Sequence, residues 1–349
     1  MIINKIPVVF TADNGYVKPL STVIASILKN SSPDVSYEFN ILTTSITPDN
    51  QARITSLAYL NRNARFNFID VSSCVKNLSL EKYPLKKQPV EMCYRLFIEE
   101  LLKDYTKVIY LDSDVLVLED LTNLFNIDIS NYYAGVVHDE GVEYKLKNKK
   151  SRTIFYKPPI DYKLYFKEKL KKSCLEYFNS GVLLLNLQKM REDDISKKIW
   201  KFICYESPLE FTEQDSSNAI MEGKVLYLDG KWNMAKDAHL LASKIRNIAL
   251  ENYKKPAIFH YTGKTKPWLL HNGNYGYGFI SDWWKYYKLT GFYEKSDDKI
   301  LRKIKCRMLI SDVEVINFKL FGFTVLEIFT KANGLRLTIL GLKIKLRFR

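Results

Sequence analysis

Residues 107–119, KVIYLDSDVLVLE, place two carboxylates between two apolar runs. Residues i and i+2 of an extended chain point to the same side, so Asp112 and Asp114 can face one point at the end of a buried strand. Carboxylates that lose their hydration repel each other unless a positive group lies between them. A strand-end turn with two solvated aspartates is the plainer alternative. The apolar runs on both sides favour a site for a divalent cation.

Strand and helix patterns alternate along the first part of the chain. We expect strands over 6–11, 39–43 and 64–71, with helices over 16–29 and 47–60 between them. Such connections are right-handed crossovers that build a parallel sheet. Ligands of these sheets bind beyond the carboxyl ends of the strands. Asp13 and Asp112 both fall at such ends.

The same alternation continues to His260. The expected elements are a helix over 90–102, a strand over 132–138, a helix over 188–205, a short helix from Glu213, and strands over 225–228 and 256–260. Segment 141–172 shows little regular pattern, and we expect a mobile basic loop inserted in the sheet domain.

The net charge of +14 is concentrated in two segments. Segment 141–172 holds eleven Lys or Arg against three Asp or Glu, and 299–349 holds twelve against three. Charge this local predicts anionic partners at two places.

Composition also changes after residue 295. We expect a catalytic domain over 1–295 and a basic, apolar extension over 296–349. Within the extension, FKLFGFTV at 318–325 is similar to LTILGLKIKL at 337–346. The two stretches predict short β-strands, in either a packed β-extension or an element that docks on an anionic membrane.

The five cysteines are far apart and include no C-x-x-C pair, which argues against a disulfide framework or a structural zinc site. Lys5 and Pro7 interrupt the apolar start, so no secretory signal is expected. No apolar run approaches the roughly 18 residues of a spanning helix. We expect a cytoplasmic protein, either free or peripheral on the inner face of the cytoplasmic membrane.

Two further motifs suit a nucleotide and a sugar. In FTADNGY at 10–16, Asp13 could accept an imide N–H of a planar base on which Tyr16 stacks; Tyr16 could equally pack a helix. In FNSG at 178–181 and EQD at 213–215, buried amides and carboxylates need partners that sugar hydroxyls offer. Ordinary helix capping is the alternative for these polar groups.

The motif IFHYTGKTKPW at 258–268 ends an expected strand on a histidine. The His260 imidazole can be a third protein ligand to an ion whose other ligands are carboxylates. Gly263 allows backbone amides to approach a phosphate, and Lys266 can neutralise one.

In combination, these motifs resemble glycosyltransferase family 8, the bacterial lipopolysaccharide galactosyl- and glucosyltransferases and their glycogenin-like relatives. The resemblance runs over about 7–268, and its most specific parts are YLDSDVL, FNSGVLLLNL and HYTGKTKPW. It implies an α/β, Rossmann-like GT-A fold with a mostly parallel sheet. It also implies a UDP-sugar donor, Mn²⁺ or Mg²⁺, and retention of anomeric configuration.

The resemblance also implies roles for individual residues. Asp112, Asp114 and His260 would bind the metal, and Asp13 and Tyr16 would hold uracil in a nucleotide site that Thr11 and Ser113 also line. Gly263 and Lys266 would bind the diphosphate, Arg95 the donor sugar and phosphate, and Asn179 the sugar. The implied catalytic residues are Gln214, Glu213 and Asp112.

Two residues depart from the family pattern. Gly15 replaces a polar residue, and Glu213 stands where an aspartate is usual, which leaves the donor-sugar contacts open. An amide oxygen is weakly basic, so we expect front-face attack, with the leaving phosphate taking the acceptor's proton, rather than attack by Gln214.

The predicted function is retaining transfer of galactose or glucose from a UDP-sugar to a cell-surface glycan, the core of lipopolysaccharide or lipooligosaccharide. A sugar-nucleotide pyrophosphorylase would need a basic, Gly-rich loop after the first strand, whereas 10–16 holds one Gly and no cation. A non-catalytic, basic surface-binding relative is the other alternative. Nucleic acid is not an expected partner.

Overall fold

The computed structural model describes residues 4–77, 90–148, 150–154, 156–172, 176–235, 255–263, 266–269, 279–301 and strands within 316–347. The chain divides into two compact units, Met1–His260 and Tyr261–Arg349. The division predicted at residue 295 stays a prediction.

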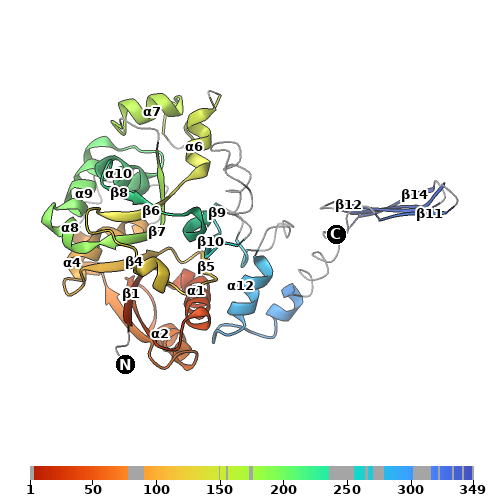
Figure 1. Ribbon diagram of the computed structural model, residues 1–349, viewed down its shortest axis with the longest axis horizontal. Coiled ribbons are helices and arrows are strands. Elements are labelled where there is room, and N and C mark those ends of the chain that lie inside the picture. The colour runs from red at the N-terminus through yellow and green to blue at the C-terminus, as the bar shows by residue number, and fades with distance from the viewer. Residues whose placement is uncertain are drawn as a thin grey trace. The chain divides into compact units, whose positions relative to one another are not determined.

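A seven-stranded sheet forms the centre of the first unit, in the order β3-β2-β1-β4-β7-β6-β8 (Figure 1). Its strands are β1 (Asn4–Thr11), β2 (Val35–Thr43), β3 (Arg65–Asp70), β4 (Lys107–Leu111), β6 (Ala134–His138), β7 (Phe178–Asn186) and β8 (Val225–Tyr227). β7 runs antiparallel to β4 and β6, and the other neighbours are parallel. The prediction of an α/β fold with a mostly parallel sheet is confirmed.

Helices connect these strands close to where the sequence predicts them. They include α1 (Val17–Asn30), α2 (Pro48–Thr55), α3 (Ser72–Asn77), α4 (Ile98–Leu101), α5 (Thr122–Phe125), α8 (Leu187–Glu192), α9 (Ile195–Glu206) and α10 (Thr212–Ile220). The Thr47 side chain caps α2, and Pro48 is its first residue, as expected of a helix start.

Two expected helices differ in detail. Most of 90–102 is the 3-10 helix η4 (Val90–Phe97), and only its end is the α-helix α4. The helix expected over 188–205 is two helices, α8 and α9, which meet at Asp194. Asp194 has φ 50°, a left-handed conformation that an α-helix cannot contain.

A second, three-stranded sheet brings the end of the first unit to the loop after β4. It has the order β5-β10-β9, with β5 (Val115–Val117), β9 (Met234–Ala235) and β10 (Ile258–His260). In the register, His260 pairs with Val115 of β5 and with Ala235 of β9. This pairing places the last residue of β10 next to the residue that follows Asp114.

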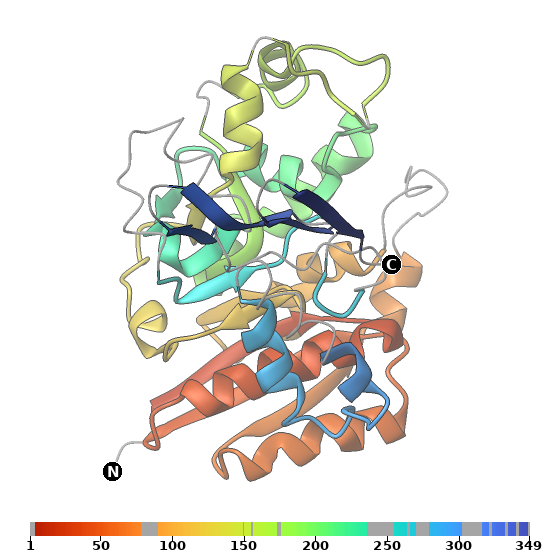
Figure 2. The same ribbon diagram turned by 90° about the vertical axis from the view of Figure 1, so that its right-hand side faces the viewer.

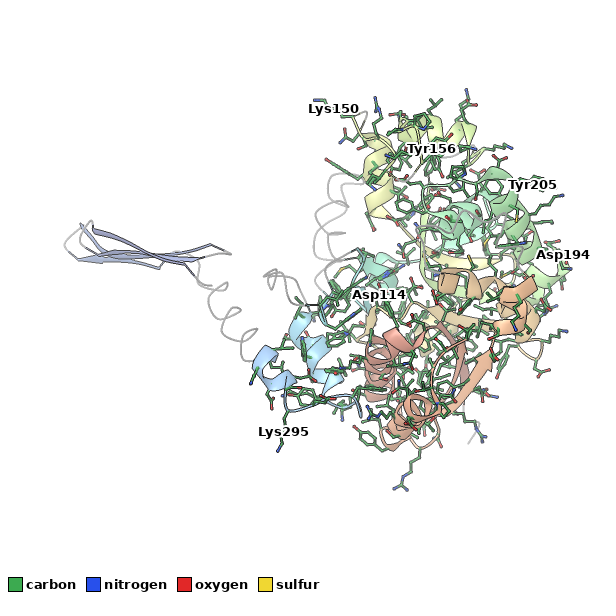
Figure 3. The ribbon with its side chains drawn as sticks, turned by 180° about the vertical axis from the view of Figure 1, so that it is seen from behind. Asp114, Lys150, Tyr156, Asp194, Tyr205 and Lys295 are labelled. Carbon is green, nitrogen blue, oxygen red and sulfur yellow. The ribbon has the colours of Figure 1, made fainter. Side chains whose placement is uncertain are left out.

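The expectation that 141–172 is a loop is wrong, because the described part of this basic segment contains two helices. It forms α6 (Glu140–Lys147) and α7 (Tyr162–Glu168), which Figures 1 and 2 show together at one end of the first unit. Figure 3 labels Lys150 and Tyr156 of the connection between them. Glu210, fully buried, accepts hydrogen bonds from the backbone N–H groups of Ile154 (2.8 Å) and Tyr156 (2.9 Å). Partners more than 50 residues away therefore order this segment.

Asp215 is a second buried acceptor beneath the same segment. It takes hydrogen bonds from Phe211 N–H (2.7 Å), Tyr165 O–H (2.6 Å) and Tyr177 O–H (2.7 Å). Burial raises the pKa of Asp215 to about 6, although these bonds oppose the rise.

This pKa predicts a pH-dependent contribution to stability. Because the folded value lies above the ordinary 3.8, the folded state binds the proton more tightly, and stability rises as pH falls from about 6 towards 4. At 1.36 kcal/mol per pKa unit, the unfolding free energy of wild type relative to Asp215→Asn should rise by about 2 kcal/mol between pH 7 and pH 4.5 in urea titrations. The pKa of exposed Asp128 is lowered from 3.8 by Ser130, so its contribution to stability changes only below about pH 4, and the control Asp128→Asn should show almost no change between pH 7 and pH 4.5. Equal differences at both pH values would contradict the prediction.

The second unit contains α12 (Ile280–Tyr287) and a four-stranded antiparallel sheet. Its strands are β11 (Ile316–Leu320), β12 (Phe323–Lys331), β13 (Gly334–Ile339) and β14 (Leu342–Arg347). The similar stretches 318–325 and 337–346 run from β11 into β12 and from β13 into β14. Among the described residues, no helix is long and apolar enough to cross a membrane.

Candidate functional site

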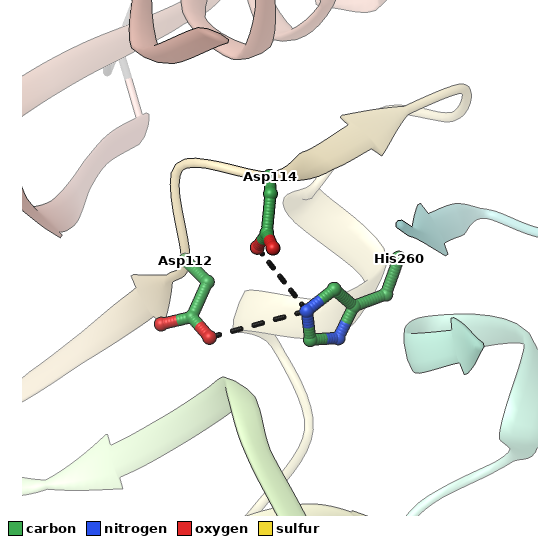
Figure 4. A group of neighbouring side chains, drawn as sticks. All are labelled: Asp112, Asp114 and His260. Atoms are coloured by element: carbon green, nitrogen blue, oxygen red, sulfur yellow. Dashed lines mark ion pairs between the residues drawn. The ribbon is translucent and has the colours of Figure 1, made fainter. Parts of the chain in front are cut away.

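The structure brings together the three predicted metal ligands. Asp112 follows β4, Asp114 precedes β5 and His260 ends β10 (Figure 4). His260 Nε2 lies 3.2 Å from Asp114 Oδ1 and 3.9 Å from Asp112 Oδ2, and one ligand atom of each residue lies within 4.8 Å of the others. Two carboxylates and one imidazole suit a divalent ion such as Mn²⁺. The donor set therefore fits the implied metal.

The antiparallel direction of β7 brings the FNSG motif to the same place. Leu111 at the end of β4 pairs with Val182, and Asp112 N–H donates to the Gly181 carbonyl at 2.8 Å. The beginning of β7 thus lies beside the end of β4. Residues 179–181 reach the site because they lie at the beginning of β7.

Gly181 leaves room for the imidazole. A Cβ at this position would lie 2.2 Å from His260 Cε1 and 2.8 Å from Nδ1. Real Cβ contacts are longer than 3.0 Å, so any side chain at residue 181 displaces His260.

A buried arginine fixes Asp112. Arg95 donates from Nη2 to Asp112 Oδ1 at 2.9 Å, and its guanidinium lies over the Tyr110 ring at 4.4 Å. Tyr110 O–H donates to the same oxygen at 2.7 Å. Because Oδ1 already has two donors, the other oxygen, Oδ2, faces His260.

Arg95 also bridges to the sugar motifs. It donates to the Ser180 carbonyl at 2.6 Å and lies 3.4 Å from Glu213. Burial lowers the pKa of Arg95, but Glu213, Tyr110 and Asp112 outweigh it and hold the pKa above its ordinary value. Burial raises the pKa of Glu213, and Arg95 opposes that rise.

A cleft of about 270 Å³ adjoins the carboxylates. Its lining contains all the residues predicted for the base, with Arg95 and both aspartates: Thr11, Ala12, Asp13, Tyr16, Glu91, Met92, Arg95, Asp112, Ser113 and Asp114. Asp13 caps η1 (Asn14–Tyr16) by accepting from Tyr16 N–H at 2.9 Å, and the Tyr16 side chain is 42% exposed. A larger cleft of about 580 Å³, near Glu99 and Trp200, contains none of the predicted site residues.

The two amides predicted to face the sugar, Asn179 and Gln214, share one carboxylate. Asn179 Nδ2 and Gln214 Nε2 donate to Asp139 Oδ2 at 3.1 and 3.2 Å, while Ser180 N–H donates to Gln214 Oε1 at 3.0 Å. Sequence reasoning missed Asp139, although its place directly after an expected strand was a usable signal. It also missed Asn233, whose Oδ1 lies 2.9 Å from His260 Nδ1. No local pattern in the sequence marks Asn233 as a site residue.

The remaining two predicted residues belong to the second unit. Gly263 has φ 76°, which favours glycine, and Lys266 Nζ donates to the Tyr261 carbonyl at 2.5 Å. Their assignment to the diphosphate stays a prediction, as do the roles of the other site residues.

Comparison with known proteins yields a family and a fold. The model of the family described as glycosyl transferase family 8 matches residues 7–271. General stress protein A of Bacillus subtilis (strain 168) is 27% identical over 296 residues, which are 81% of this chain and 93% of that protein. Lipopolysaccharide 1,2-glucosyltransferase of Escherichia coli (strain K12) is 28% identical over 184 residues, which are 51% of this chain and 48% of that protein.

Among solved structures, the chain is similar to the galactosyltransferase LgtC in complex with donor and acceptor sugar analogues. The TM-score is 0.66 at 24% identity, over 84% of this chain and 99% of LgtC. The predicted GT-A fold is confirmed.

Proposed function

The chain belongs to glycosyltransferase family 8, and we propose that it transfers galactose or glucose from a UDP-sugar to a cell-surface glycan with retention of configuration. The observation that carries this proposal is the cluster of Asp112, Asp114 and His260 beside the cleft of about 270 Å³. The acceptor that we propose is the core of lipopolysaccharide or lipooligosaccharide, and the name of the Escherichia coli relative supports a lipopolysaccharide acceptor.

Asp112, Asp114 and His260 would hold the metal, with Mn²⁺ preferred and Mg²⁺ as the alternative. A bound divalent ion would serve as a Lewis acid for the two phosphates of the departing UDP. Arg95 and Tyr110 hold Asp112 for this task, since both donate to its Oδ1.

The cleft that contains Asp13 and Tyr16 would receive uracil. Asp13 would accept an imide N–H, and the exposed Tyr16 ring would stack on the base. Thr11 and Ser113 line the same cleft. Gly263 and Lys266, three and six residues after His260, would bind the diphosphate through a backbone amide and a cation.

Tyr16→Ala should weaken binding of the donor. Stacking of a base on an aromatic ring contributes about 1–3 kcal/mol, so the KM for the UDP-sugar should rise roughly tenfold or more with little change in kcat. Tyr59→Ala, which removes a 63% exposed tyrosine from η2 (Ser56–Tyr59), is the matched control. A similar KM for Tyr16→Ala and wild type would remove Tyr16 from the base site.

The contacts of Glu213 and Gln214 favour front-face attack. Glu213 is 2% exposed, and its carboxylate accepts hydrogen bonds from the hydroxyl groups of Ser217 (2.7 Å) and Ser180 (3.2 Å). A carboxylate that is buried and bonded in this way is a poor nucleophile. Gln214 Oε1 accepts from Ser180 N–H, which further reduces its weak basicity. The leaving phosphate would then take the proton of the acceptor. A glycosyl adduct trapped on Glu213 or Gln214 would overturn this part of the proposal.

The folded basic segment 141–172 would contact phosphates of the acceptor. Its exposed lysines include Lys150, Lys157 and Lys163. Exposed ion pairs contribute about 0.2–1 kcal/mol each, so changing all three to Gln should raise the KM for a phosphorylated lipid-linked acceptor roughly tenfold. UDP-sugar hydrolysis without acceptor should be unchanged. A control variant with the exposed residues Lys29, Lys103 and Lys198 changed to Gln should keep the wild-type KM for the acceptor. If the variant of segment 141–172 also keeps the wild-type KM, the segment does not contact the acceptor.

The extension 296–349 would dock the cytoplasmic enzyme on an anionic membrane. The sequence of β14 alternates Lys or Arg with Leu or Ile, the composition of a surface-binding strip. Sedimentation with anionic but not neutral vesicles would support this role, and sedimentation with neither would exclude it.

The proposed activity is tested by UDP release from a panel of UDP-sugars with and without Mn²⁺. We expect Mn²⁺-dependent turnover of one UDP-hexose, lost in Asp114→Asn. Turnover of no UDP-sugar would exclude the transferase activity and favour a non-catalytic relative.

A further inference from the structure

A line of hydrogen bonds joins His260 to Asp139 through two amides. His260 Nδ1 lies 2.9 Å from Asn233 Oδ1, Asn233 Nδ2 donates to Asn179 Oδ1 at 2.9 Å, and Asn179 Nδ2 donates to Asp139 Oδ2 at 3.1 Å. Asn233 is 2% exposed and His260 is 4% exposed. At this burial the two side chains depend on each other for their hydrogen bonds.

Fixed groups at both ends determine which way each amide points. Gly181 N–H is always a donor, and it lies 2.9 Å from one end of the Asn179 amide, which must therefore be Oδ1. The Asp139 carboxylate requires a donor at the other end, which agrees. Since Asn179 Oδ1 is an acceptor, the Asn233 group that faces it is the NH₂ group. Its oxygen must then face His260.

The proton of neutral His260 is consequently on Nδ1. Only a ring N–H can bond to the Asn233 oxygen, and the hydrogen bond at one ring nitrogen decides the state of the other. In this tautomer Nε2, 3.2 Å from Asp114 Oδ1 and 3.9 Å from Asp112 Oδ2, is the nitrogen that can bind a cation held between it and the two carboxylates.

We propose that Asn233 is a positioning residue, which fixes His260 as the Nδ1–H tautomer and so prepares Nε2 to bind the metal. This proposal rests on the proposed function, because the free lone pair matters only if the site holds a divalent ion. Asp139 anchors both Asn179 and Gln214, so one carboxylate supports the orientation of the metal ligand and of the sugar-side amide.

The tautomer can be read in the metal-free protein. Nitrogen-15 spectra of histidine-labelled protein, assigned with His260→Gln, should show a protonated Nδ1. Asn233→Ala should shift this population towards Nε2–H, and Asn233→Asp, which keeps an acceptor, should preserve it. A wild-type His260 without a proton on Nδ1 would overturn the proposal.

Metal affinity gives a second readout. Asn233→Ala should weaken Mn²⁺ binding about 10–100-fold, as removal of a ligand's hydrogen-bond partner typically does, and Asn233→Asp should restore most of it. Asn40→Ala is the control, because Asn40 is 1% exposed and its amide contacts Asn67 and Glu38. Wild-type affinity in Asn233→Ala would overturn the proposal. Absence of Mn²⁺ binding in the wild type would instead refute the metal site of the proposed function. The nitrogen-15 spectra of the metal-free protein would still show whether Asn233 fixes the His260 tautomer.

Discussion

Gly181→Ala is expected to weaken metal binding more than any other single change outside the three ligands. The new methyl group would lie 2.2 Å from His260 Cε1, so the imidazole must move away from Asp112 and Asp114. Changes to groups that only orient a ligand weaken metal binding about 10–100-fold, and displacement of the ligand itself should exceed roughly 100-fold. Mn²⁺ titration of the purified variant measures this effect.

Gly223→Ala is the matched control for this experiment. Gly223 has φ 72°, and a methyl group on its Cα would meet nothing within 4 Å, so the substitution strains the backbone but fills no occupied space. It should cost roughly 1–2 kcal/mol of stability and leave the Mn²⁺ affinity unchanged. Unchanged affinity in Gly181→Ala would show that His260 is not a ligand in the position described.

Arg95→Met should destabilise the protein strongly. Arg95 is the cation beside Glu213, which is 2% exposed, and it also bonds to Asp112 and the Ser180 carbonyl. Removal of one partner of a buried ion pair costs about 3–5 kcal/mol, because the other charge remains buried without compensation. Urea denaturation near neutral pH should show a loss of this size.

The double variant Arg95→Met/Glu213→Gln tests the cause. A neutral amide at residue 213 removes the uncompensated charge, so the double variant should be more stable than Arg95→Met alone. If it is equally or less stable, the loss comes from packing or from the bonds to Asp112 and Ser180. Transfer activity should stay low in both variants, since Asp112 lacks its arginine in both.

Local patterns in the sequence were sufficient to predict much of this site. Asp13 and Asp112 each follow a short apolar run, and the parallel strands β1 and β4 of the seven-stranded sheet bring such positions to one edge. His260 also ends an apolar run, but it reaches the site from the three-stranded sheet, as the last residue of β10.

Other parts of the site depend on pairings that local patterns do not encode. Nothing in FNSGVLLLN indicates that β7 runs antiparallel to β4, yet this direction brings Gly181 to Asp112 and His260. Asn233 contacts a residue 27 positions away, so a single buried asparagine before a two-residue strand gave no signal. The prediction of a loop over 141–172 failed for the same reason, because the backbone of this segment donates hydrogen bonds to Glu210, which lies outside it.

Calorimetric binding of UDP with and without Mn²⁺ tests the central claim most directly. If Asp112, Asp114 and His260 hold an ion that the donor's phosphates require, wild-type protein should bind UDP tightly only with Mn²⁺. Asp114→Asn should bind UDP weakly in both conditions. Equal UDP affinity with and without Mn²⁺ in the wild type, unaffected by Asp114→Asn, would contradict a metal-dependent donor site.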